Sequence, residues 1–148
     1  MSGFKWGLVG LLALGFSAVS LAQDRLISPG AGTAERKAIL DGVRPAVELK
    51  LQGEVQFVVN SIQAYKGWAM VSASPQRKDG RKFDAVKLFG KDQSMQMDGL
   101  TVTALLQRRG GNWVLVEHMI GATDVWWEPY CHEKPRRIPA EVLGVCPN

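Results

Sequence analysis

Glu117 and His118 are the adjacent pair in this sequence best suited to acid–base chemistry. A carboxylate and an imidazole can cooperate when both side chains reach the same reacting group. Neighbours on a β-strand point to opposite faces, so we expect Glu117 to share a face with Trp113 and Leu115, and His118 to take the other. No dyad within the strand is predicted. Under a helix, His118 would be a hydrogen-bonded core histidine, whereas a buried Glu117 would be an acid or base candidate.

Other catalytic chemistries find less support in the sequence. No G-x-S-x-G motif marks a serine nucleophile, and no H-E-x-x-H motif marks a metal site. The remaining candidates are Asp124, His132 and the loop from Asp79 to Asp84, and for Asp124 a turn or cap role is expected. We therefore predict no metal site and no cofactor.

The two cysteines of the chain, Cys131 and Cys146, both lie near its end. In an exported protein such a pair is most simply a disulfide, which would hold the proline-rich tail. The alternative is a zinc site that recruits His132 and Glu133, but the metal-binding spacings C-x-x-C and H-x-x-x-H are missing.

Three large rings, Trp126, Trp127 and Tyr130, follow closely after Asp124. They have a structural reading, in which they cap the open end of a sheet and anchor the tail. They also have a functional reading as an exposed contact surface, because Trp and Tyr dominate binding anchors. Both readings stay open, and we name the three rings as the candidate binding residues.

Regular elements must position these groups, and the first is a helix over residues 34–51. Thr33 suits its N-cap, and the apolar residues recur at helical spacing: Ile39, Leu40, Val43, Val47 and Leu51. Pro45 removes a backbone donor, so we expect either a kink or a second helix that begins there.

After Gly53 the apolar period changes to two, which predicts strands. A hairpin is expected from residues 54–74, turning at Lys66 and Gly67 and ending at Pro75. A second hairpin is expected from TVTALLQRR and WVLVEHMIGA around the turn GGN, with a further short strand over residues 85–89. The fold class is therefore α+β: a kinked N-terminal helix packed on a curved antiparallel meander sheet of four to five strands.

The first 22 residues have the order of a signal peptide: Lys5, an apolar run, and small residues ending at Ala22. We expect cleavage before Gln23, a linker over residues 23–32 and one domain over residues 33–148. A retained membrane anchor is the alternative, but the apolar run is short and contains several glycines and serines. The expected location is periplasmic or secreted, with no stable membrane anchor after cleavage.

The charge of the chain argues against nucleic acid as a partner. Of 18 basic residues, loss of Lys5 leaves 17 against 14 acidic residues, a net charge of about +3. The basic residues form small separated groups rather than a run, which is typical of solvated turns.

A helix followed by late strands that read ALLQRRGGNWVLVEHMIG is similar to the cystatin-like and nuclear transport factor-like folds. The stretches ILDGVRPAVE, FVVNSI, GWAMVSASPQ and GATDVW also resemble a group of uncharacterised exported bacterial proteins. The resemblance covers most of residues 36–127 and implies a compact exported module, without an activity to transfer.

Two function classes remain, and the first is a non-catalytic binding or inhibitor module that acts on a protein or cell-envelope partner. An immunity-type protein that neutralises a toxin is a special case of it. The second class is a small-molecule enzyme that uses a pocket carboxylate, Glu117 above all. A closed pocket around that carboxylate would favour the enzyme, and a filled core with exposed aromatics would favour the binder.

Overall fold

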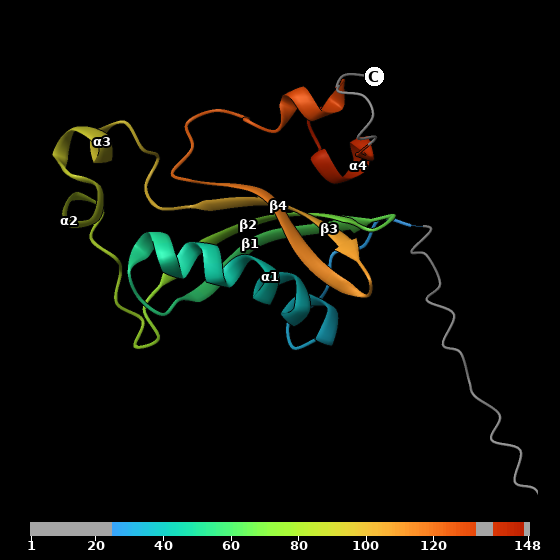
Figure 1. The fold of residues 1–148 in the computed structure, drawn as a ribbon, viewed down its shortest axis with the longest axis horizontal. Helices are drawn as coiled ribbons and strands as arrows, with labels where there is room; N and C mark the ends of the chain where they lie inside the picture. Colours follow the sequence, from blue (N-terminus) through green and yellow to red (C-terminus); the bar gives the residue numbers. More distant parts are fainter. Residues whose placement is uncertain (1–24, 133–137, 147–148) are drawn as a thin grey trace, which may run out of the picture.

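The computed structural model describes residues 25–132 and 138–146, in which one helix lies on one face of a sheet and the chain's tail on the other (Figure 1). The predicted signal peptide, residues 1–22, lies outside the described residues. The elements in chain order are α1 (Ala34–Leu51), β1 (Gln56–Tyr65), β2 (Trp68–Gln76), α2 (Ala85–Phe89), α3 (Lys91–Met95), β3 (Val102–Arg109), β4 (Asn112–Ile120), the 3-10 helix η1 (Glu128–Cys131) and α4 (Ala140–Leu143). The α+β class is therefore confirmed.

Helix α1 begins and ends where its sequence predicts. Thr33 caps it, because its hydroxyl accepts a hydrogen bond from the Arg36 amide at 3.3 Å, and Gln52 closes it in the left-handed conformation. The helix runs as one element through Pro45, so no second helix starts there. The kink expected at Pro45 stays a prediction, as does the curvature of the sheet.

The four strands form an antiparallel meander in the order β1-β2-β3-β4, so each strand pairs with its neighbour in the chain. Both predicted hairpins are present: Tyr65 pairs with Trp68 across one turn, and Arg109 with Asn112 across the other. The first hairpin extends slightly further than predicted, because Pro75 lies within β2 opposite Phe57.

Residues 85–89, expected as a short strand, are instead the helix α2. The residues that indicate a helix, Asp84 and Gly90, lie just before and just after the apolar run. Asp84 accepts a hydrogen bond from the Lys87 amide at 3.0 Å, which caps the start of the helix, and Gly90 closes its end at a φ of 80°. With α3 it forms an excursion that projects beyond one end of the sheet (Figure 1).

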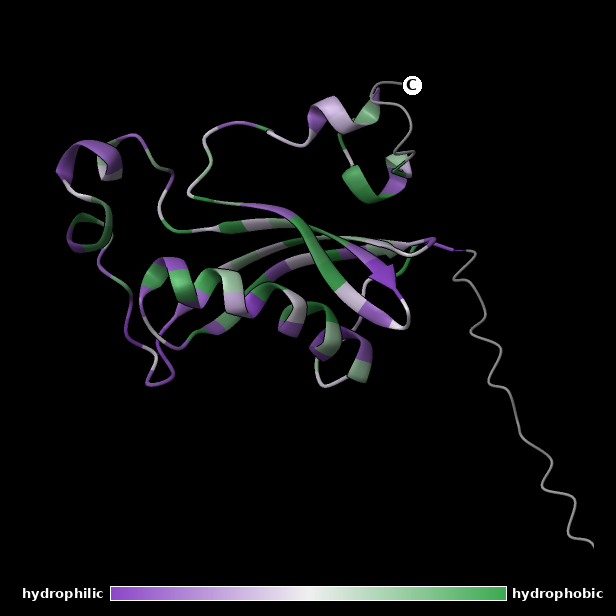
Figure 2. Ribbon diagram, viewed as in Figure 1, coloured by the Kyte–Doolittle hydropathy of each residue, from purple (hydrophilic) through white to green (hydrophobic). Residues whose placement is uncertain are grey.

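The face of the sheet under α1 carries the larger apolar cluster, here called the helix-side cluster. Its helix residues are fully buried: Ile39, Val43, Val47 and Leu51. Gly42 lets the helix approach closely, because a Cβ there would lie 2.8 Å from the Trp113 carbonyl oxygen and 2.9 Å from a Leu106 methyl. Figure 2 shows apolar and polar residues alternating around this helix.

The opposite face carries a smaller apolar group, here called the tail-side cluster. Trp68, Met70 and Leu105 supply the sheet residues, and Val142 and Leu143 of α4 are buried against them. The chain returns over this face after β4 through η1 and α4 (Figure 1).

Part of the segment expected as a linker contacts the sheet. Ile27 and Ala64 exchange two backbone hydrogen bonds of 2.9 Å, so a short bridge lies against the outer edge of β1. Pro29, two residues further on, is buried. Chain contacts with the sheet therefore begin before Thr33, the position at which the fold was expected to start.

Candidate functional site

The two candidate catalytic residues, Glu117 and His118, lie on opposite faces of β4, as predicted, but Trp113 and Leu115 do not share the face of Glu117. Glu117 pairs with Leu105 and Leu115 pairs with Leu106, so Val116 is an extra residue that forms a β-bulge. The bulge reverses the alternation after Leu115. Glu117 therefore lies on the tail side, away from Leu115.

His118 lies on the helix side, because it pairs with Ala104 of the helix-side cluster. Partial burial lowers the pKa of His118, and the positive charge of Lys50 lowers it further, while Glu117 opposes the shift. His118 lies on the face that α1 covers and is only partly buried, so the role of a hydrogen-bonded core histidine stays a prediction. With Glu117 on the other face, the two groups do not meet at one reacting atom.

The three predicted binding rings are half-buried and hold the tail on the sheet. The Trp126 indole donates a hydrogen bond to the Thr103 hydroxyl at 2.7 Å, and the Trp127 indole donates one to the Leu143 carbonyl at 3.0 Å. Their ring centroids lie 5.5 Å apart, edge to face. These contacts give both tryptophans a structural role, with part of each ring still exposed.

Tyr130 joins the same group, and its hydroxyl donates a hydrogen bond to the Glu117 carboxylate. Glu117 is itself exposed, so this carboxylate is not enclosed in a pocket. Its partnership with Tyr130 ties the tail to β4.

Cys131 and Cys146 form the predicted disulfide, with their Cα atoms 5.4 Å apart. The bond links the end of η1 to the residues just after α4, and both cysteines pack against the tail-side cluster. Glu133 of the alternative zinc site lies outside the described residues. Within the described ranges, 25–132 and 138–146, no cluster of three metal-binding side chains occurs.

The tail covers only part of its face of the sheet. Along β2 the residues that point to this face change from apolar to polar, in the order Trp68, Met70, Ser72, Ser74 and Gln76. The first two are buried beneath the tail, and the last three are partly exposed. A strip of hydroxyl and amide side chains thus continues where the tail ends, and we call it the polar strip.

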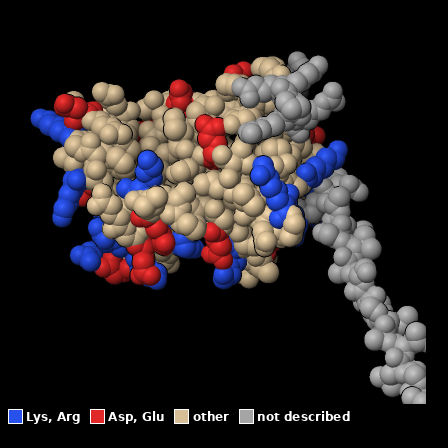
Figure 3. Space-filling model, in the orientation of Figure 1, with Lys and Arg blue, Asp and Glu red and all other residues tan. Residues whose placement is uncertain are grey.

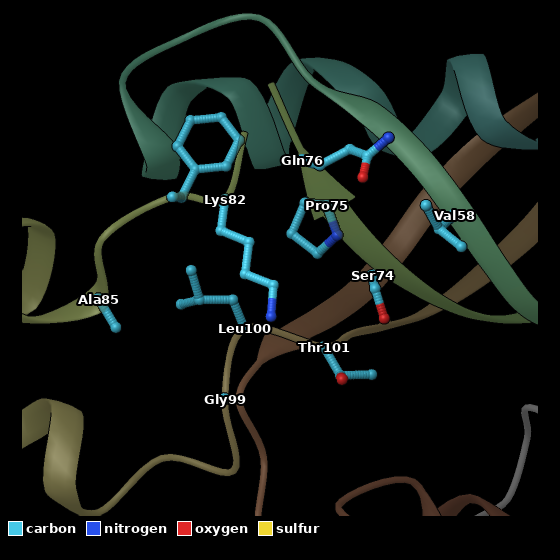
Figure 4. Close-up of a pocket in the computed structure, with 10 residues that line it drawn as sticks. Val58, Ser74, Pro75, Gln76, Lys82, Ala85, Gly99, Leu100 and Thr101 are labelled. Atoms are coloured by element: carbon cyan, nitrogen blue, oxygen red, sulfur yellow. The ribbon is translucent and has the colours of Figure 1, made fainter. Parts of the chain in front are cut away.

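A cavity lies at each end of the polar strip. The tail cavity, of about 210 Å³, is bounded by Trp127 and Leu143 above and by Ser61, Ser72 and Thr103 on the strands. The second, of about 350 Å³, lies between the strands and the loop that leads to α2, and we call it the loop pocket (Figure 4). It was not predicted from the sequence.

The surface of the protein carries charges of both signs without a field of one sign on the face shown. Figure 3 shows Lys and Arg interspersed with Asp and Glu along the side that bears α1, and few charges on the side that bears the tail. Ion pairs such as Lys37–Asp41 and Lys78–Glu54 account for part of this mixing. The pKa of Asp41 is lowered, chiefly by its hydrogen bond to Lys37.

Comparisons with known proteins return nothing: no protein-family model, no curated protein and no solved structure matches this chain. The resemblance to the cystatin-like and nuclear transport factor-like folds therefore stays a prediction. Among the described residues, no helix is long and apolar enough to cross a membrane.

Proposed function

We propose that this protein is an exported, non-catalytic binding module that acts on a protein or cell-envelope partner. The observation that carries the proposal is the polar strip beside the tail cavity. Its hydroxyl and amide groups supply directional hydrogen bonds, and the exposed part of Trp127 supplies a rigid apolar wall next to them. Rigid aromatic rings beside adaptable polar groups are a recurrent composition of binding surfaces.

Export is supported by the signal-like order of residues 1–22 and by the Cys131–Cys146 disulfide. Disulfides persist in oxidising compartments and are rare in the reducing cytosol. The expected location is therefore the periplasm or the extracellular medium, with cleavage after Ala22. Intact-mass analysis of the exported protein tests this, and a chain that still begins at Met1 would contradict it.

The enzyme alternative draws less support from the same geometry. Glu117 is exposed and hydrogen-bonded to Tyr130, and neither the tail cavity nor the loop pocket has a carboxylate among the described residues that line it. A small-molecule enzyme of the kind expected would place its carboxylate inside such a pocket. Loss of an activity in Glu117→Gln, with folding intact, would reverse our ranking of the two functions.

Capture of a partner from cell-envelope extract tests the binding proposal. Ser72→Arg places a bulky charge on the polar strip, and Leu49→Arg places the same side chain on the far side of α1, where Leu49 is 79% exposed. We expect the wild type and Leu49→Arg to capture the same partner, and Ser72→Arg to lose it. Equal capture by all three proteins would exclude the polar strip as the contact surface.

Alanine substitutions test the part played by Trp126, Trp127 and Tyr130 themselves. Trp127→Ala should lower the free energy of unfolding by about 3 kcal/mol, because it removes a packed ring and leaves a cavity. Tyr130→Ala should weaken partner binding while stability changes by only about 1 kcal/mol, the typical value of one hydrogen bond. If all three substitutions cost stability and none costs affinity, the rings are structural only.

A further inference from the structure

The loop pocket has apolar walls but contains one cationic side chain. Val58, Pro75, Phe83 and Leu100 provide apolar surface, and Lys82 is the charged residue of the lining. Val58 is 50% exposed and adds apolar surface to the same pocket. Figure 4 shows the Lys82 side chain extending from its loop across the pocket toward Leu100 and Thr101.

Lys82 differs from the other basic residues of its loop, each of which has a partner. Lys78 pairs with Glu54 at 2.7 Å, and Arg81 pairs with Asp79 at 2.7 Å. The Arg77 guanidinium lies over the Phe83 ring, 4.6 Å from its centroid. These contacts occupy the carboxylates of Glu54 and Asp79.

No acidic group among the described residues lies within ion-pair distance of Lys82. The acid nearest to it in sequence, Asp84, caps helix α2 instead. Lys82 is exposed, and because no acidic group of the described residues neutralises its ammonium, that charge is available to an anionic partner that enters the pocket.

Two hydroxyl groups lie in the same pocket as that ammonium. The Thr101 hydroxyl has no hydrogen-bond partner among the described residues, although the Thr101 carbonyl accepts a hydrogen bond from the Gly121 amide. The Ser74 oxygen accepts a hydrogen bond from the Asn60 side chain at 3.4 Å, which leaves the Ser74 proton to donate. A carboxylate accepts hydrogen bonds at both of its oxygens, so an ammonium and two hydroxyls suit it. The apolar walls suit a hydrocarbon body attached to that carboxylate.

We propose that the loop pocket binds a small carboxylic acid with an apolar body, such as a medium-chain fatty acid or an aryl-alkanoic acid. The carboxylate contacts Lys82, Thr101 and Ser74, and the body lies against Phe83 and Leu100. The volume of about 350 Å³ falls in the range of small-molecule sites, roughly 300–1,000 Å³. This site is separate from the tail cavity, shares Ser74 and Gln76 with the polar strip, and goes beyond the binding function proposed above.

The experiment is a titration of the oxidised protein, isolated from cells that express the full chain, with octanoate and with 3-phenylpropionate, followed by NMR. Both acids should shift the backbone signals of Ala85, Leu100 and Thr101. Lys82→Gln should weaken binding about tenfold, and the neutral analogue 1-octanol should bind the wild type about tenfold more weakly than octanoate. The matched control Lys87→Gln, on α2 and outside the pocket lining, should bind as the wild type does.

Several results would overturn the proposal. The proposal is wrong if neither acid binds at millimolar concentration. It is also wrong if Lys82→Gln binds octanoate as tightly as the wild type does, or if the wild type binds 1-octanol as tightly as octanoate. Shifts confined to Trp127 and Leu143 would place the acid in the tail cavity and would also exclude the loop pocket. Because these results leave the capture of an envelope partner unaffected, failure here is distinguishable from failure of the proposed function.

Discussion

One face of the sheet is covered by an 18-residue helix that shares one apolar cluster with residues of all four strands, whereas the other is covered at one end by two short helical segments and a disulfide. The helix contributes four residues whose exposed fraction is 1% or less, and both caps of that helix are satisfied. The tail buries Val142 and Leu143 against the sheet and adds two indole hydrogen bonds, one tyrosine contact and the Cys131–Cys146 bond.

Strand β2 serves a different purpose on each face of the sheet. Toward α1, the β2 residues Ala69, Val71 and Ala73 are all buried and small enough for a close helix. Toward the tail, the same strand begins with Trp68 and ends with Gln76, so burial gives way to a polar surface. Such a surface gains little stability, and hydrogen-bonding groups left open there are available to a partner.

The largest expected effect is a loss of stability that differs between two adjacent residues, one on each face of the sheet. Leu105 and Leu106 are both fully buried, the first under the tail and the second under α1. Leu106→Ala should lower the free energy of unfolding by about 4 kcal/mol, and Leu105→Ala by about 2 kcal/mol, because the short tail can shift to fill the cavity. Denaturant unfolding measures both values. Equal losses at the two sites would mean that the tail is packed as rigidly as the helix.

Removal of the disulfide tests the tail more directly. The double variant Cys131→Ser and Cys146→Ser should lose about 3 kcal/mol, the chain-entropy estimate for a loop of this size. The wild type treated with a reductant is the matched comparison, and it should lose a similar amount. If neither the double substitution nor the reductant changes the unfolding midpoint, the aromatic contacts alone hold the tail.

The smallest effect concerns His118 and its pH dependence. Burial lowers the pKa of His118 in the folded chain below its ordinary value of 6.5, so the unfolded chain binds more protons once the pH falls below about 6.5. Stability should therefore fall as the solution is acidified through and below that pH, and rise again as the pH increases.

The variant His118→Gln isolates this contribution. As the pH falls from 7.5 to about 5, its free energy of unfolding should change less than that of the wild type. His132→Gln, which keeps His118, is the control, and the contribution of His118 to the pH dependence of its stability should equal that in the wild type. Parallel pH profiles for the wild type and His118→Gln would contradict the assignment.

Much of the fold follows from local signals in the sequence. The Thr33 cap, the helical spacing up to Leu51 and the turns at Lys66–Gly67 and Gly110–Gly111 each predict their element, because each rests on the conformational preferences of a few neighbouring residues. The strand predicted for residues 85–89 was wrong, because a run of five residues is too short for apolar spacing to separate a strand from a helix. Asp84 and Gly90, which cap the helix, carried the signal for it.

The candidate sites depend on features that local pattern does not contain. The Val116 bulge has no glycine or proline to mark it, so a strict alternation assigned Glu117 to the wrong neighbours. The loop pocket joins residues from β1, β2, the following loop and the residues before β3, and Lys82 becomes distinctive only when its neighbours are found to be paired. The bulge at Val116 and the loop pocket both depend on contacts between segments that are distant in the sequence.

The bridge between Ile27 and Ala64 has a practical consequence for anyone who prepares this protein. It occupies part of the outer edge of β1, where unpaired backbone groups would otherwise invite a strand from a second molecule. A shortened chain that starts at the first helical residue would lose this protection and invite aggregation. Expression designs should therefore keep the residues from Arg25 onward and place any cleavable tag ahead of them.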